Sequence, residues 1–387
     1  MLERKNPVRW LTPALVFCVV FSVECAGQKP FSIVVLPDTQ NYADARKKAD
    51  GTRAIPDYSR HFYGQTLWIK ENAAKLNTVM VAHVGDVVQT DEPDEWKIAD
   101  KAFKAIDGVV PYVICQGNHD LRVGRDGARD TRLNEFFPPS RFRSAPWYAG
   151  HYGKGNENNY ALFEAGGMKF LIISLEFAPR DEVLKWADEV VAKHPDRRTI
   201  IVTHGYLNHG RRIARRAMGY KWKGNSAEEM WRKFVSRHKK IFLVLSGHAD
   251  SCRLSSVGKH GNTVHQVQSN YQFGDEGGQG YLRVMTFVPG ENRIDVTTYS
   301  PTVNRNMTTK TDAFSLKYEM CGKAVRRTEQ ARRFLSRNQL AYWTTSPVRT
   351  RDRAIVRAEA GRSKKQGKQN LTTLRSSPPK NPQTPSG

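Results

Sequence analysis

The chain has 387 residues, 39% of them hydrophobic, and a formal net charge of +23. This length allows one large α/β domain with extensions or two ordinary domains, and it excludes a small domain without a sizeable core. Roughly half of the positive charge follows residue 322, so the pattern predicts a basic tail on a more moderately basic core.

The N-terminal residues are typical of an export signal. Arg4, Lys5 and Arg9 form a positive segment, and residues 10–23 form a mostly apolar one that is short for a transmembrane helix. Small residues at positions 25–27 suit cleavage. We therefore expect an exported protein, periplasmic or extracellular, with an uncleaved membrane anchor as the alternative.

The next part of the chain alternates apolar strand patterns with amphipathic helix patterns. A strand at residues 33–36 is followed by a helical pattern, a second strand, a second helical pattern and a third strand, which is the order of successive βαβ units. Gly166-Gly167 predicts the turn of a β-hairpin. The expected later strands and helices cover residues 62–76, 78–82, 94–106, 109–115, 133–142, 159–163, 168–175, 181–193, 199–202 and 241–245.

Beyond residue 250 the pattern is rich in short strands separated by glycine and proline turns. These strands cover residues 253–257, 263–268, 281–288, 294–299 and 314–316. Alternating βα units followed by such a meander predict an α/β fold with two packed sheets and helices outside. We expect a signal peptide at residues 1–27, one domain at 28–322 and a basic, largely disordered tail at 323–387.

Five of the apolar strands end in side chains that are able to bind a metal ion. Ligands of open α/β sheets bind at the carboxyl ends of the strands, so these side chains are expected to share one crevice. The polar residues at the five strand ends are Asp38 and Gln40, Asp86, Asn118 with His119 and Asp120, His204, and His248 with Asp250.

These motifs, led by Gly117-Asn118-His119-Asp120, resemble those of the calcineurin-like metallophosphoesterase superfamily, over residues from about 31 to 318. The resemblance implies two packed mixed β-sheets flanked by helices, and the hydrolysis of phosphate esters. Pro37-Asp38-Thr39-Gln40 is similar to the first motif of an exported bacterial branch. Two positions depart from the usual pattern, because Gln40 and Asp250 stand where many members have histidine.

The resemblance also implies a role for each motif residue. Asp86 would bridge two divalent cations, which neutralise the charge of the ester and acidify a bridging water into hydroxide. His119 would protonate the leaving oxygen, oriented by Asp120. The remaining ligands would be Asp38, Gln40 and Asp250 at the first cation, and Asn118, His204 and His248 at the second.

The expected ligands also bear on the identity of the cations. The first cation would have only oxygen ligands, which favours manganese, magnesium or iron(II) over zinc. The second, with two imidazoles, suits manganese, iron or zinc. We therefore expect Mn²⁺ or Fe²⁺, with Zn²⁺ or Mg²⁺ as alternatives.

Other residues have weaker patterns. His209 and Asn270 are candidates for substrate contact, and Arg211 and Arg212 begin a basic cluster that would attract anionic substrates if it borders the crevice. The alternative for this cluster is a solvated basic loop. Cys252 and Cys321 are a possible disulfide pair.

Three functions remain open on the sequence alone. The first is an exported two-metal phosphoesterase acting on monoesters or diesters. The second is a nuclease that holds a phosphate backbone with its basic residues, for which steep salt dependence is expected. The third is a metal-poor binding module anchored by the tail, which would bind nucleic acid, an acidic polymer or an anionic surface. The sequence defines neither the leaving group nor the oligomeric state.

Overall fold

The computed structural model describes residues 27–123, 128–215 and 219–321. The tail expected at residues 323–387 and all of the expected signal peptide except Gly27 lie outside these ranges. Within them, no helix is long and apolar enough to cross a membrane.

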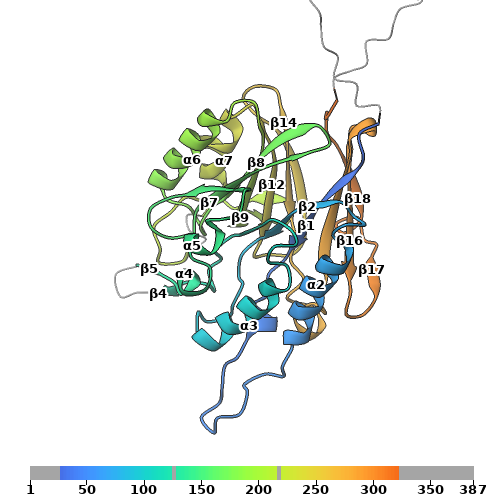
Figure 1. The fold of residues 1–387 in the computed structure, drawn as a ribbon. Helices are drawn as coiled ribbons and strands as arrows, with labels where there is room; N and C mark the ends of the chain where they lie inside the picture. The colour runs from blue at the N-terminus through green and yellow to red at the C-terminus, as the bar shows by residue number, and fades with distance from the viewer. Residues whose placement is uncertain (1–26, 124–127, 216–218, 322–387) are drawn as a thin grey trace, which may run out of the picture. The chain divides into compact units, whose positions relative to one another are not determined.

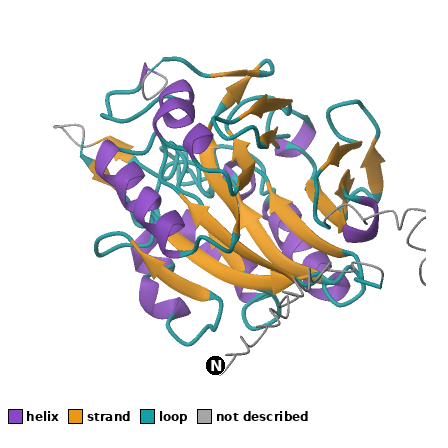
Figure 2. Ribbon diagram, turned by 90° about the horizontal axis from the view of Figure 1, so that it is seen from above, coloured by secondary structure: helices purple, strands orange, loops and turns teal. Residues whose placement is uncertain are grey.

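Two mixed β-sheets, each of seven strands among the described residues, form the centre of the fold (Figures 1 and 2). In the first sheet the strand order is β17-β16-β15-β1-β2-β3, and β18 also pairs with β16. The bounds are β1 (Phe31–Leu36), β2 (Thr78–His83), β3 (Tyr112–Ile114), β15 (Leu282–Val288), β16 (Arg293–Ser300), β17 (Arg305–Met307) and β18 (Phe314–Lys317).

The second sheet has the order β13-β14-β12-β9-β8-β7-β6. Its strands are β6 (Tyr148–His151), β7 (Asn159–Ala165), β8 (Met168–Ser174), β9 (Arg198–Gly205), β12 (Ile241–Gly247), β13 (Arg253–Val257) and β14 (Thr263–Gln268). Two short ribbons lie outside the sheets, β4 (Arg122–Val123) with β5 (Arg129–Asp130) and β10 (Leu207–Asn208) with β11 (Arg211–Arg212).

Successive side chains of the central strands point to opposite faces of the sheet, so each strand contributes to two hydrophobic layers. In β1, Ile33 and Val35 face the core between the sheets, whereas Val34 and Leu36 pack with Phe62 of the outer helices. The first sheet is covered by α2 (Ser59–Asn72) and α3 (Pro93–Lys104), and the second by α6 (Asp181–Lys193) and α7 (Ala227–Lys233). The shorter helices are α1 (Gln40–Ala43), α4 (Leu133–Phe136), α5 (Pro139–Phe142), η2 (Val235–Arg237), η3 (Asp275–Gly277) and η4 (Pro289–Glu291).

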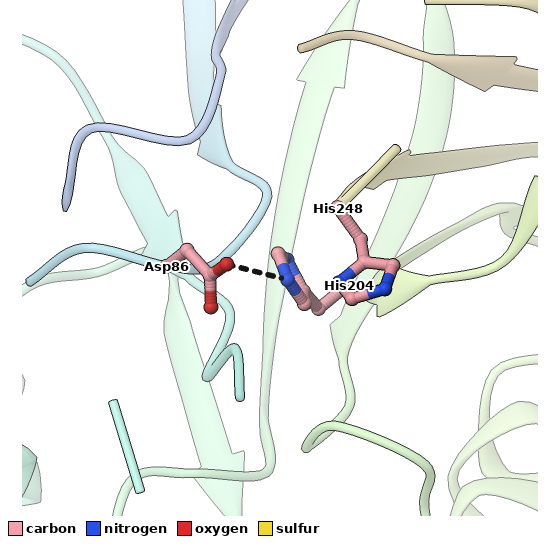
Figure 3. A group of neighbouring side chains, drawn as sticks. All are labelled: Asp86, His204 and His248. Atoms are coloured by element: carbon pink, nitrogen blue, oxygen red, sulfur yellow. Dashed lines mark ion pairs between the residues drawn. The ribbon is translucent and has the colours of Figure 1, made fainter. Parts of the chain in front are cut away.

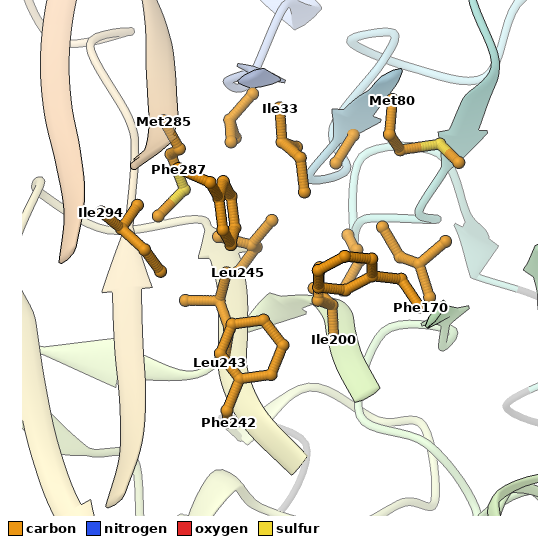
Figure 4. Close-up of a cluster of buried hydrophobic side chains, with 14 of the residues drawn as sticks. Ile33, Met80, Phe170, Ile200, Phe242, Leu243, Leu245, Met285, Phe287 and Ile294 are labelled. Carbon is orange, nitrogen blue, oxygen red and sulfur yellow. The ribbon is translucent and has the colours of Figure 1, made fainter. Parts of the chain in front are cut away.

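The core between the sheets joins the two halves of the site. Figure 4 shows side chains of both sheets meeting there, among them Ile33, Met80, Phe170 and Ile200. Because β1, β2 and β3 are parallel, as are β9 and β12, the carboxyl ends of each group lie at one edge of their sheet. Packing the sheets face to face brings these edges together.

The predicted α/β sandwich is confirmed, with differences in detail. The segment at residues 133–142, expected as a helix stopped by proline, has a first helix that ends before Pro138 and a second short helix after it. Gly166 and Gly167 both have positive φ, 54° and 69°, as the predicted hairpin turn requires. The Cys252–Cys321 disulfide that the sequence left possible is not formed, since Cys252 is a free thiol.

Candidate metal centre

The centre of the site is a group of three side chains from both sheets. Asp86 follows β2, His204 lies in β9, and His248 follows β12. Their ligand-capable atoms all lie within 4.8 Å of one another (Figure 3). His204 Nε2 lies 3.0 Å from Asp86 Oδ2. The structure therefore brings together three residues that the sequence predicted from separate motifs.

Asn118 belongs to the same group. Its Oδ1 lies 3.1 Å from His204 Nε2 and 2.9 Å from His248 Nδ1. His204 Nδ1 donates to the carbonyl of Val84 at 2.9 Å, so the neutral imidazole carries its proton on Nδ1 and a lone pair on Nε2. That lone pair then faces oxygen atoms of Asn118 and Asp86. Three converging electron-pair donors are stabilised by a proton or a cation, so the residues fit a divalent metal.

The backbone around these residues is unusual. Asp86 and His248 both have positive φ, 52° and 76°, a conformation that costs a non-glycine residue about 1–3 kcal/mol and is often found at functional sites. A Cβ atom at Gly117 would overlap Asp86, and one at Gly247 would overlap Asp38. The glycines of these motifs therefore allow the strand ends to approach closely.

Burial and mutual charge perturb the titration of the site. Burial alone would lower the pKa of His204, but the carboxylates of Asp86 and Asp38 outweigh it and raise this pKa to about 9. Burial alone would raise the pKa of Asp86, but His204 outweighs it and lowers this pKa to about 2. Burial raises the pKa of Asp38 well above its usual range.

Asp38 and Gln40 lie beside this group, where the first cation was predicted. Asp38 accepts hydrogen bonds from the backbone N–H of His248 at 2.9 Å, from Asn270 Nδ2 at 3.1 Å and from Gln272 Nε2 at 3.2 Å. Gln40 Nε2 lies 3.4 Å from Asp86 Oδ2 and also contacts Gln272. Asp250, predicted as a ligand here, is exposed.

The contact that orients the His119 ring differs from the one that was expected. His119 Nδ1 donates to the carbonyl of Gln89 at 2.9 Å. Asp120 instead accepts from the backbone N–H groups of Val88 at 2.9 Å and Gly117 at 2.7 Å, which joins the loops that follow β2 and β3. The prediction that Asp120 orients the His119 ring is corrected accordingly. Burial and the charge of Asp86 raise the pKa of Asp120 to about 8.

Two residues of the site were missed by sequence reasoning. Gln272 contacts Asp38 and Gln40, and the hydroxyl of Tyr220 accepts a hydrogen bond from Asn118 Nδ2 at 3.2 Å. Tyr220 is 42% exposed and makes an edge-to-face contact with Phe177. Both residues lie in loops without a periodic pattern, so only their residue types were available as a signal.

The candidate substrate residues have different positions. Asn270 is buried and contacts Asp38. His209 and Arg211 are exposed in and beside the β10–β11 ribbon. The guanidinium of Arg212 is paired with Glu228 at 2.7 Å and also donates to Ser256 and Gln266, so its charge is already compensated.

Comparison with known proteins gives one family match and several similar chains. The model of a family described as calcineurin-like phosphoesterase matches residues 31–250. The chain is 32% identical over 302 residues to the uncharacterized protein YvnB of Bacillus subtilis (strain 168). That match covers 75% of this chain and 21% of the relative, so the chain spans about a fifth of the relative's length.

Solved structures with similarity to this chain include two phosphatases. Purple acid phosphatase PPD1 from yellow lupin (Lupinus luteus) has a TM-score of 0.47 at 13% identity, covering 76% of this chain and 54% of that chain. A dimetal phosphatase from Danio rerio has a TM-score of 0.47 at 14% identity, covering 75% of this chain and 99% of that chain.

Proposed function

Because this chain belongs to the calcineurin-like phosphoesterase family, we propose that it hydrolyses phosphate esters with a pair of divalent cations. The family match confirms the resemblance that the strand-end motifs predicted. The observation that carries the proposal is the convergence of the ligand-capable side-chain atoms of Asp86, Asn118, His204 and His248.

Each side chain of the site has its own role in the proposed reaction. Asn118, His204 and His248 would hold one cation and Asp38 and Gln40 the other, with Asp86 between them. When bound, the cations would neutralise the charge of the ester and lower the pKa of a water molecule.

His119 would supply the proton that the leaving oxygen requires. The Gln89 carbonyl fixes the proton of Nδ1, so the ring acts as an acid through Nε2 of its protonated form.

The donor atoms also guide the choice of metal. The group around Asp86 and His204 combines imidazole nitrogens with oxygens, which suits manganese, iron or zinc. The group around Asp38 offers oxygen donors, which favours manganese, magnesium or iron(II). We expect Mn²⁺ or Fe²⁺ to support the highest activity.

The finer description of the activity is a proposal about substrate and location. The N-terminal sequence supports an exported enzyme. The nuclease alternative relies on basic residues near the crevice, and the pairing of Arg212 with Glu228 removes one of them from free contact with a phosphate backbone. We therefore place small phosphate monoesters or diesters before nucleic acid as substrates.

The test is hydrolysis of bis-p-nitrophenyl phosphate and p-nitrophenyl phosphate by the metal-stripped full chain, titrated with Mn²⁺, Fe²⁺, Zn²⁺ and Mg²⁺. Turnover that depends on a metal and is lost in Asp86→Ala supports the proposal, and the ratio of the two rates separates diesterase from monoesterase. His119→Ala should lower these rates less, because nitrophenolate leaves without a proton. A chain that binds fewer than two cations and turns over neither ester would instead support the metal-poor binding module.

A further inference from the structure

The amides around Asp38 differ from the residues that the sequence pattern placed there. Gln272 Nε2 donates to Asp38 Oδ2 at 3.2 Å, and the same amide contacts Gln40. Asn270 Nδ2 donates to the same Asp38 oxygen at 3.1 Å. Two side-chain amides therefore donate to Asp38, and a third, that of Gln40, contacts Gln272 and Asp86.

Gln40 gives an independent indication that a cation belongs among these amides. Its side chain is fully buried, and its Oε1 has no hydrogen-bond partner among the described residues. The amide end lies between Asp86 and Gln272. A buried carbonyl oxygen without a donor is costly, and a cation would remove that cost.

Asp250 is in a different position. The Nε2 of Gln268 donates to the backbone carbonyls of Ala249 and Asp250, both at 3.0 Å, which fixes the segment after His248. The side chain of Asp250 is exposed and lines a pocket of about 330 Å³ beside Tyr271 and Phe273. Asp250 therefore lies among the residues of this pocket, whereas Gln272 donates a hydrogen bond directly to Asp38.

We propose that Gln272, and not Asp250, completes the first cation site. Its Nε2 faces Asp38 and its Oε1 faces Gln40 in the structure, so the amide turns over to present its oxygen as the ligand. This inference rests on the proposed function, and it adds a prediction about the two cations. Imidazole nitrogens bind first-row transition-metal ions more strongly than amide oxygens do, so the site with Asp38, Gln40 and Gln272 is expected to hold its cation less tightly than the site with His204 and His248. The protein would then bind one tight and one exchangeable cation, and the exchangeable one would be of the oxygen-preferring class such as Mn²⁺ or Mg²⁺.

The experiment measures Mn²⁺ binding by the metal-stripped full chain, with equilibrium dialysis and metal analysis, and electron paramagnetic resonance of free Mn²⁺ as a second readout. Gln272→Ala should weaken binding of the exchangeable cation by about 10-fold or more and leave the affinity for the tight cation unchanged, because loss of a ligand costs at least as much as loss of a residue that only supports one. Gln272→Glu should tighten the weaker site, because it adds a carboxylate. Asp250→Ala is the matched control and should change neither affinity.

The opposite result, a weaker site lost in Asp250→Ala and unchanged in both Gln272 variants, would overturn the inference while leaving the proposed function intact. If Gln272→Ala loses both cations, the Gln272→Glu variant decides. An unchanged affinity for the exchangeable cation in Gln272→Glu would also overturn the inference. A wild-type chain that binds none of Mn²⁺, Fe²⁺, Zn²⁺ and Mg²⁺ would overturn the proposed function itself.

Discussion

His119 Nδ1 lies 2.9 Å from the backbone carbonyl oxygen of Gln89. A carbonyl only accepts hydrogen bonds, so the proton of a neutral His119 lies on Nδ1 and Nε2 carries the lone pair. Only the protonated ring has an N–H on Nε2 to give to a leaving group. The Gln89 contact therefore makes the acid function of His119 depend on its charged form and fixes the direction in which the ring points.

The first prediction concerns this acid function. His119→Ala should lower turnover of an alkyl phosphate ester by about 10²–10⁴-fold, because an alkoxide leaves poorly without a proton. The loss with p-nitrophenyl phosphate should be smaller, since nitrophenolate is a good leaving group. The measurement is kcat for both esters, with metal content as the control. Equal losses for the two esters would show that His119 does not act as the acid.

The second prediction tests the close approach at Gly117. A Cβ atom there would overlap Asp86, so Gly117→Ala should lower the free energy of unfolding by about 1–3 kcal/mol and abolish metal-dependent turnover. Gly290→Ala is the control, because a Cβ atom at Gly290 meets nothing within 4 Å. Urea unfolding compares the two variants. Similar stabilities for both would mean that the loop at Gly117 adjusts without cost.

Much of the fold and part of the site were predictable because local pattern and tertiary structure agree. The helix expected at residues 181–193 has those bounds, since its apolar face packs on the second sheet. Asp86, Asn118, His204 and His248 were predicted as ligands from their positions at strand ends, and parallel strands do bring them together. The parallel strand order alone places these four residues together, so the sequence pattern was sufficient to predict them as a group.

Contacts made by irregular loops were not predictable in the same way. Gln272 and Tyr220 are far from the strand-end motifs in sequence, and side-chain direction in a loop depends on backbone angles that composition does not define. Asp120 illustrates the same limit within a motif. It adjoins His119 in sequence, yet its carboxylate accepts from two backbone N–H groups and the His119 ring is held by Gln89.

The third prediction concerns acid stability. His83 is fully buried, accepts a hydrogen bond from the N–H of Gly85 at 3.1 Å and contacts Thr39 Oγ1 at 2.9 Å, and burial lowers its pKa to about 3. The unfolded chain protonates His83 below about pH 6.5, whereas the folded chain does so only near pH 3. The free energy of unfolding is therefore highest above pH 6.5. It declines as the pH falls from 6.5 to about 3, by up to roughly 1.4 kcal/mol per pH unit.

A titration of unfolding free energy in the metal-free chain between pH 7 and pH 3 measures this effect. His83→Gln keeps a donor and an acceptor but does not titrate, so its stability should decline less steeply over the same range. Carboxylates that titrate in this window contribute to both proteins and cancel in the comparison. Parallel curves for the two proteins would assign the acid sensitivity to other groups.

The fourth prediction concerns Tyr220. The hydroxyl of Tyr220 accepts from Asn118 Nδ2 at 3.2 Å, which keeps Oδ1 of that amide toward His204 and His248. Tyr220→Phe should weaken the tighter cation by about 10-fold, because the amide loses the contact that orients its oxygen. Tyr299→Phe is the control, since it also removes a tyrosine hydroxyl, one that donates to Oδ1 of Asn304 at 2.8 Å, and Asn304 is not a proposed ligand. Equilibrium dialysis measures the affinity of both variants for the tighter cation. Equal affinities would contradict this role of Tyr220.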